Sequence, residues 1–306
     1  MSNNAITVFT PTFNRAYCLH KCYESMKRQT NKNFEWLIID DGSTDGTKEL
    51  VDGWIKENND FTIRYIYKEN GGMHTAYNTA YENIETELSI NIDSDDYLTD
   101  DAIERIISFW EKNKSPEIGG IYALDEFENG QIVGSPFPDD LKKFQGWGYK
   151  TIFYECDGVK KSFKNHGDKK FIGITSIINQ YPKIPVFEGE KFHSLYFKQH
   201  LIERDHTILI MNEPVCVVEY MEDGCSKNIY YQYIKNPKGF CDERRFVMEN
   251  APNFKLKFMA AIHYVAESMI AKDHHFIKKS TNKKCTVLAI PFGVMLYIYI
   301  KFKTRK

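Results

Sequence analysis

The stretch SINIDSDDYLTDD, residues 89–101, begins as a strand and continues as a cluster of aspartates. Residues 88–92 (LSINI) are typical of a buried strand in a parallel sheet. Asp93, Ser94 and Asp95 follow at its carboxyl end, where open α/β sheets bind their ligands. Carboxylates that are buried together are unfavourable unless a cation neutralises them, so the stretch indicates a divalent metal site.

The other aspartates of this stretch have a different explanation. Thr99 stands where a helix N-cap belongs, and Asp100 and Asp101 fill the first turn of the helix predicted to start there. Negative charge is favourable at that end of a helix dipole. Asp-x-Asp alone is a weak metal signal, since solvated turns of this composition are common.

The sequence on both sides of this stretch predicts an α/β fold. β-rich runs alternate with helix-like segments through residues 5–125, which indicates a mostly parallel, Rossmann-like sheet flanked by helices. Residues 126–186 lose this alternation and are predicted to form hairpins and loops. A helix is predicted within residues 191–203, and two strands, divided by Pro214, follow it.

The C-terminal part of the chain is predicted to be helical, and the predicted domains are 1–228 (halves 1–125 and 126–228) and 229–306. The apolar segment 287–300 lies between lysine-rich flanks, and Pro291 and Gly293 are expected to interrupt it. As a helix it would extend only about 21 Å, short of the ~30 Å hydrocarbon core of a bilayer. It is therefore either a membrane-surface segment or a helix packed on protein.

Composition excludes one class of partner. A net charge of -2 gives no general attraction to a phosphate backbone, so nucleic-acid binding is not expected. The seven cysteines are scattered without a CxxC pair, and the N-terminal residues lack the features of a signal peptide, so we expect a cytoplasmic protein.

Three further motifs follow predicted strands at the same edge of the sheet as DSDD (93–96). They are TPTFNR (10–15), IIDDGSTDGT (38–47) and ENGGMHTAYN (69–78). Together, in this order, the four motifs resemble those of family 2 glycosyltransferases of the GT-A fold, which are inverting enzymes that use a nucleotide-activated sugar. The resemblance covers residues 5 to about 125 and is much more specific than any single motif.

The resemblance implies roles for individual residues. The metal ion, Mn²⁺ or Mg²⁺, would be held by Asp95, with Asp93 contacting either the metal or the ribose. Asp41 or Asp40 would accept a hydrogen bond from the base, commonly uracil. The other residues expected at the nucleotide are Thr10, Pro11, Asn14, Arg15, Asn70, Gly71, His74 and Ser94. For Arg15 and His74 a structural or surface role stays an alternative.

The resemblance also implies a general base in the second half of the chain, usually the aspartate of a Glu-Asp pair. Residues 185–201 (PVFEGEKFHSLYFKQHL) stand in the matching place, but Lys191 follows Glu190 where that aspartate is expected. We therefore predict Glu190 as the base, with Glu188 as the alternative. Both could also be ordinary acids in the first turn of a helix.

The predicted function is the metal-dependent transfer of one sugar to a polysaccharide or lipid-linked acceptor at the inner face of the cell membrane. The expected donor is a UDP-sugar. The Gln-x-x-Arg-Trp signature of processive synthases is missing, which favours single transfer. The alternatives are a catalytically inactive membrane scaffold and a nucleotidyltransferase, although the latter normally begins with a glycine-rich loop. A homo-oligomer is left open.

Overall fold

The computed structural model describes residues 4–148, 151–219 and 229–305. The chain divides into two compact units, which are described separately. Unit 1 comprises Met1–Lys183 and Lys198–Tyr220, and unit 2 comprises Ile184–Phe197 and Met221–Lys306. The predicted boundary at residue 228 lies outside the described residues, and it stays a proposal.

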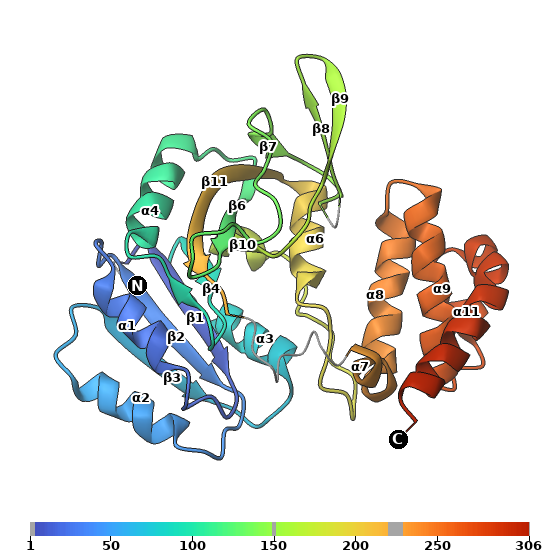
Figure 1. Ribbon diagram of the computed structural model, residues 1–306, viewed down its shortest axis with the longest axis horizontal. Helices are drawn as coiled ribbons and strands as arrows, with labels where there is room; N and C mark the ends of the chain where they lie inside the picture. Colours follow the sequence, from blue (N-terminus) through green and yellow to red (C-terminus); the bar gives the residue numbers. More distant parts are fainter. Residues whose placement is uncertain (1–3, 149–150, 220–228, 306) are drawn as a thin grey trace. The chain divides into compact units, whose positions relative to one another are not determined.

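Unit 1 is built on a nine-stranded sheet with strand order β3-β2-β1-β4-β10-β6-β11-β5, and β7 pairs with β11 (Figure 1). Its first strands, β1, β2, β3 and β4, are parallel neighbours, as the sequence predicts. The strands are β1 (Ile6–Thr12), β2 (Phe34–Asp40), β3 (Thr62–Tyr67), β4 (Leu88–Asn91), β5 (Tyr97–Leu98), β6 (Ile118–Glu126), β7 (Lys143–Phe144), β10 (Lys169–Ile174) and β11 (Thr207–Val217). A separate hairpin joins β8 (Thr151–Cys156) to β9 (Val159–Lys164).

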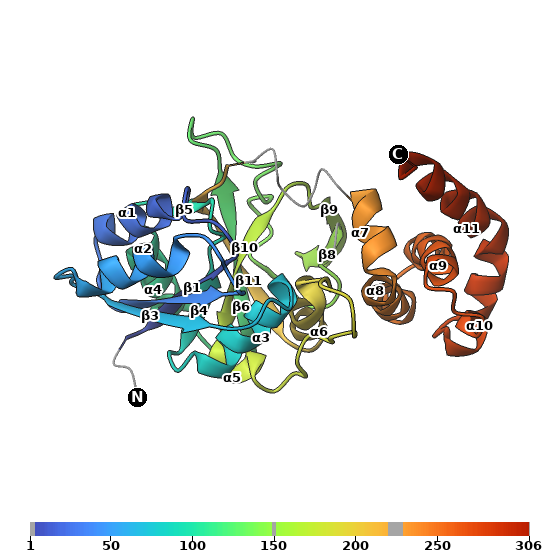
Figure 2. The ribbon, with the colours of Figure 1, turned by 90° about the horizontal axis from the view of Figure 1, so that it is seen from below.

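Helices cover both faces of this sheet, as Figure 2 shows. One face packs on α1 (His20–Arg28), α2 (Thr47–Lys56) and α4 (Ala102–Asn113), whose buried residues share one core with β1 and β2. The opposite face packs on α3 (Met73–Asn83) and α6 (Tyr196–Asp205), and α5 (Thr175–Ile178) follows β10. Every residue of β1 and β2 is buried, because a parallel sheet inside such layers has no solvent-facing side.

Three local predictions in this unit were wrong. Helix α4 begins at Ala102 with Asp101 as its N-cap, so Thr99 lies before the helix. The segment around Pro214 is a single strand, β11. Its pairing with β6 changes register on both sides of the proline, and these irregularities accommodate the missing N–H of Pro214. Strand β10, placed among the predicted loops, lies antiparallel between β4 and β6 in the middle of the sheet.

Unit 2 is helical, as predicted. Its helices are α7 (Ile229–Lys235), α8 (Pro237–Asn250), α9 (Phe254–Ile270), α10 (Phe276–Lys279) and α11 (Lys283–Lys303). The expectation that Pro291 and Gly293 interrupt the last segment was wrong, because α11 runs through both as one helix. Pro291 leaves the carbonyl of Val287 without its helical donor, and Val287 is exposed, so water can take that place.

Candidate functional site

The four sequence motifs meet at one edge of the sheet in unit 1. In the parallel register Thr12 lies beside Asp40, which lies beside Tyr67, and Phe9 lies beside Asn91 of β4. The loops that follow these four strands therefore leave the sheet at the same edge. This edge, formed by residues 10–15, 40–47, 68–75 and 93–96, is called the carboxyl-end rim below.

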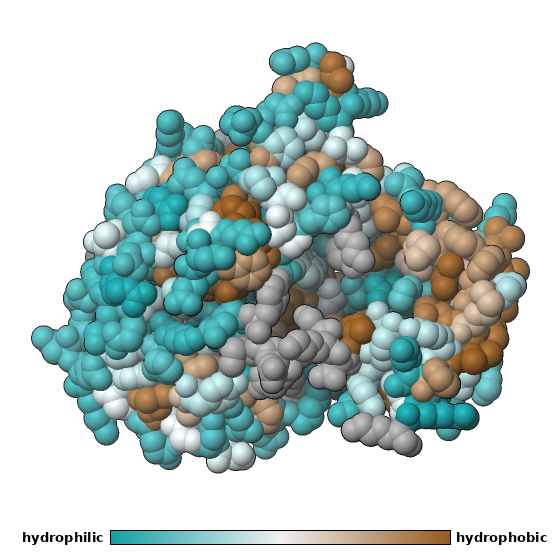
Figure 3. All heavy atoms as spheres, in the orientation of Figure 1, coloured by the Kyte–Doolittle hydropathy of each residue, from teal (hydrophilic) through white to brown (hydrophobic). Residues whose placement is uncertain are grey.

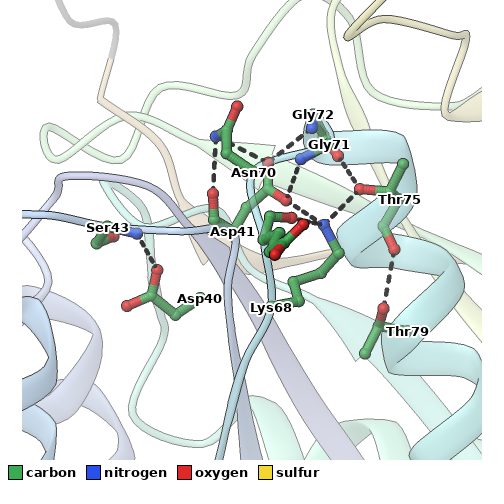
Figure 4. A network of polar contacts seen from close by, with 10 residues as sticks. Asp40, Asp41, Ser43, Lys68, Asn70, Gly71, Gly72, Thr75 and Thr79 are labelled. Carbon is green, nitrogen blue, oxygen red and sulfur yellow. Dashed lines mark hydrogen bonds and ion pairs between the residues drawn. The ribbon is translucent and has the colours of Figure 1, made fainter. Parts of the chain in front are cut away.

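Asp41 is the centre of a polar network on this rim (Figure 4). Its Oδ1 accepts from the Gly71 N–H at 3.0 Å and from the Lys68 ammonium, and its Oδ2 accepts from the Gly72 N–H at 2.8 Å. The Asn70 amide donates to the same Oδ2 at 3.2 Å and to the Asp41 carbonyl oxygen at 2.7 Å. A carboxylate has about four lone-pair sites, so these donors fill the acceptor capacity of Asp41.

The network explains why the second and third motifs have this composition. Gly42 has a φ of +86°, and a Cβ added there would lie 2.7 Å from the Asn70 backbone nitrogen. Lys68 also donates to the Thr75 hydroxyl at 2.8 Å, which ties the loop to the first turn of α3. The loop 68–75 is therefore fixed by Asp41 before any ligand binds.

Asp40 is fully buried and holds the neighbouring loop 40–47. Its two oxygens accept from the Ser43 N–H at 2.7 Å and from the Tyr65 hydroxyl at 2.6 Å. Burial and this hydrogen bond raise the pKa of Tyr65. Asn14, with a φ of 54°, receives the Thr44 N–H on its side-chain oxygen at 2.8 Å and donates its own N–H to Ser43 at 2.8 Å. Hydrogen bonds of Asn14 with Ser43 and Thr44 thus join the first and second motifs.

The remaining predicted nucleotide residues differ in position. The hydroxyl of Thr10 accepts from the Trp36 indole at 2.9 Å inside the core, and Pro11 is buried within β1. His74 is 1% exposed in the first turn of α3, whereas Arg15 is half-buried and donates to the Tyr17 hydroxyl. The side chains of Thr10 and His74 therefore lie inside the protein, and their predicted contact with a nucleotide stays a prediction.

The acidic turn 93–96 presents its side chains in alternation. Asp93 and Asp95 are half-buried, whereas Ser94 and Asp96 are buried. Asp93 accepts from the Asn91 amide at 3.1 Å, and the Cys22 thiol of α1 donates to the backbone carbonyl of Asp96 at 2.9 Å. Two carboxylates with partly open surroundings remain on the rim.

The carboxylate oxygens of Asp93 and Asp95 are suitable ligands for a hard divalent cation. Carboxylate oxygens are the ligands that Mg²⁺ and Mn²⁺ take, and such ions normally complete their shell with substrate phosphates and water. In the described ranges no group of three or more His, Cys, Asp or Glu side chains is placed to hold a metal ion. A site with Asp93 and Asp95 alone would therefore depend on the diphosphate for further ligands.

Sequence reasoning missed the buried charges behind the acidic turn. Lys170 of β10 is 7% exposed, and its Nζ lies 3.3 Å from Asp96 Oδ2. Asp125, at the end of β6, is 1% exposed. Burial raises the pKa of Asp96 to about 7 and that of Asp125 to about 6, although Lys170 opposes both shifts. Burial lowers the pKa of Lys170, but Asp125 and Asp96 more than offset this and keep the ammonium charged.

The two predicted bases lie in unit 2. Glu190 is 9% exposed, and its carboxylate accepts from the backbone N–H of Lys238 at 2.9 Å and of Gly239 at 2.8 Å, at the start of α8. Glu188, two residues earlier, is exposed. Asn236, the N-cap residue of α8, accepts from the Lys191 N–H at 2.8 Å and so holds the same loop.

Comparisons with known proteins agree with this geometry. The model of the family "Glycosyl transferase family 2" matches residues 7–164, slightly more than half of the chain. Glycosyltransferase GlyA of Streptococcus pneumoniae is 33% identical over 127 residues, which are 41% of this chain. The chain spans only 18% of the length of GlyA.

Two solved structures share the fold. Staphylococcus aureus TarS 1-349 in complex with UDP-GlcNAc has a TM-score of 0.55 at 16% identity, over 95% of this chain and 80% of that one. The mannosyltransferase PcManGT from Pyrobaculum calidifontis, in complex with GDP-Man and Mn²⁺, has a TM-score of 0.56 at 14% identity, over 98% and 88% of the two chains. At these identities the likeness is one of fold.

Proposed function

The chain belongs to glycosyl transferase family 2, and we propose that it transfers one sugar, with inversion, from a nucleotide-sugar to a glycan or lipid-linked acceptor. The observation that carries this proposal is the rim itself, where the loop 68–75, held by Asp41, follows β3 and the carboxylates Asp93 and Asp95 follow β4 of the same sheet. Complexes of the two structural neighbours with UDP-GlcNAc and with GDP-Man and Mn²⁺ support a nucleotide-sugar donor.

We propose that Asp95 and Asp93 hold Mn²⁺ or Mg²⁺ on this rim. When bound, the ion would neutralise the charge that develops on the diphosphate leaving group. Ser94, between the two carboxylates in sequence, is buried, whereas both carboxylates are half-buried. Arg15, at the end of the first motif, is proposed to supply further positive charge for the phosphates.

The base of the donor is proposed to be uracil, read by Asp41. The Asn70 amide makes the longest of the contacts to Asp41 Oδ2, 3.2 Å, and keeps a second acceptor in the Asp41 carbonyl oxygen. An imide N–H could therefore replace Asn70 on that oxygen without leaving the amide unsatisfied. Asp40 would then act through Ser43, as a support of the loop.

A panel of nucleotide sugars tests the donor. We expect a UDP-sugar with Mn²⁺ to raise the melting temperature, because a ligand at 100 times its Kd adds about 2.7 kcal/mol to the stability of the folded state. Differential scanning fluorimetry with UDP-, GDP- and ADP-sugars, with Mn²⁺ or with EDTA, measures this. Stabilisation that is equal with EDTA would contradict the metal site, and stabilisation by GDP- or ADP-sugars alone would contradict uracil.

For the acceptor half of the reaction we propose Glu190 as general base. Glu190→Gln keeps the shape of the side chain and removes its charge, so we expect turnover to fall by about 10²-fold with donor affinity nearly unchanged. Glu188→Gln should have a milder effect. Steady-state kinetics with a saturating acceptor measures both, and an inactive Glu188→Gln beside an active Glu190→Gln would move the assignment.

A matched control is needed because Glu190 also binds the start of α8. Asn236→Ala removes the neighbouring contact to the Lys191 N–H but no carboxylate. If Glu190 is the base, Asn236→Ala lowers the melting temperature as much as Glu190→Gln does and leaves turnover largely intact. Equal losses of turnover in the two variants would show that Glu190 acts only by holding the loop.

The acceptor is proposed to be a polysaccharide or lipid-linked glycan, and the site of action the inner face of the cell membrane. Helix α11 supports this location, because it is long and apolar enough, by length and composition, to cross a membrane. The sugar and the linkage would be set by the loops of residues 126–186.

A further inference from the structure

The outward side of α11 carries a continuous row of exposed apolar side chains. Six of them define the apolar stripe and are spaced to lie on one side of the helix: Val287, Leu288, Phe292, Met295, Ile298 and Phe302, which are 46–70% exposed. Figure 3 shows hydrophobic side chains gathered over this helix. A soluble domain rarely leaves a row of this kind uncovered.

The opposite side of α11 packs on α9. Ala289, Gly293 and Ile300 are buried, and a Cβ added at Gly293 would lie 2.5 Å from the Cβ of Val265. This close approach means that α11 is part of the core of unit 2. A helix of 21 residues extends about 31 Å, enough to cross the ~30 Å hydrocarbon core, but a crossing helix would have to leave its contact with α9.

Charges at the two ends of the stripe indicate what covers it. Lys283 and Lys284 precede it, and Lys301, Lys303 and Arg305 surround its last residue, Phe302. The sequence has no Asp or Glu after Asp273. A second copy of the same chain would bring like charges together at such a surface. An anionic lipid surface instead offers phosphates to the lysines and acyl chains to the stripe between them.

We propose that the apolar stripe lies in the headgroup region of a bilayer rich in anionic lipid, with α11 parallel to the membrane plane. Exposed Phe254 and Met259 of α9 extend the inserted surface, and Phe258 contacts Phe292 across the two helices, with ring centroids 5.7 Å apart. This inference deepens the proposed location, but membrane binding of this kind needs neither donor nor transfer.

Vesicle binding tests the inference with the full chain. We expect co-sedimentation with vesicles of phosphatidylglycerol and phosphatidylcholine, weaker binding as salt rises, and little binding to phosphatidylcholine alone. Met295→Glu combined with Phe302→Glu should lower the bound fraction at least about tenfold. Ile55→Glu, at an exposed apolar residue of α2 in unit 1, is the matched control and should bind normally.

Three further readouts decide the interpretation. Equal melting temperatures of the double variant and the parent would show that α11 still packs on α9, as the inference requires. Donor binding measured without vesicles should be the same in the double variant and the parent. A failure of the proposed sugar transfer can therefore be distinguished from a failure of membrane binding. Equal sedimentation of parent and double variant, or a dimer that the double variant dissociates without vesicle binding, would overturn the inference.

Discussion

Asp95→Asn is expected to abolish both sugar transfer and metal-dependent donor binding. The substitution keeps the shape of the side chain and removes one of the two half-buried carboxylates of the acidic turn, where a divalent ion needs anionic oxygen ligands. Isothermal titration of UDP with and without Mn²⁺ measures the binding, and hydrolysis of the nucleotide sugar measures the chemistry. The parent should show Mn²⁺-dependent hydrolysis, which an inactive scaffold would not.

Asp100→Asn is the matched control in the same stretch of sequence. Asp100 is exposed and pairs with Arg28 Nε at 2.8 Å, so its loss should lower stability by less than about 1 kcal/mol and leave donor binding intact. Equal losses of activity in the two folded variants would mean that the aspartates were divided wrongly between metal binding and structure. Hydrolysis that persists in Asp95→Asn would reject Asp95 as a metal ligand.

The rim could be predicted because its signals are local. The motifs lie at the ends of β1, β2, β3 and β4, and parallel strands of one sheet must place these motifs at the same edge. The network around Asp41 needed the structure, since its donors come from residues 68–72, after the next strand.

Other features depend on contacts between distant residues. Strand β10 begins with Lys169 and Lys170, and two lysines predict a solvated loop unless a buried carboxylate is known to face one of them. The alternative role of Glu190, an acid in the first turn of the helix that follows it, does not describe its contacts, because Glu190 binds the start of α8, 48 residues further on. The length of α11 was underestimated because the predicted segment was limited to the uncharged run 287–300, whereas the helix also includes the flanking lysines and extends from Lys283 to Lys303.

Lys170→Met is expected to cause a large loss of stability of the folded protein. It removes the counter-charge of two buried carboxylates, those of Asp96 and Asp125, while the shape of the side chain is nearly kept. Breaking a buried ion pair in this way costs about 3–5 kcal/mol, because a buried charge is left without compensation. Urea unfolding at pH 7.5 measures the difference, and Lys164→Met, at an exposed lysine of β9, should be nearly neutral.

The deficit of Lys170→Met should shrink as the pH falls. Asp96 and Asp125 have folded-state pKa values of about 7 and about 6, above the usual value of 3.8, so the folded state binds more protons than the unfolded state. For such groups stability is greatest at low pH and is lost as the pH rises toward the folded pKa. Without Lys170 these pKa values rise further, which makes the variant more sensitive to this change than the parent. Urea unfolding at pH 5 and pH 7.5 measures this effect: the difference in free energy of unfolding between parent and variant should be smaller at pH 5. An equal difference at both pH values would show that Lys170 does not compensate these carboxylates.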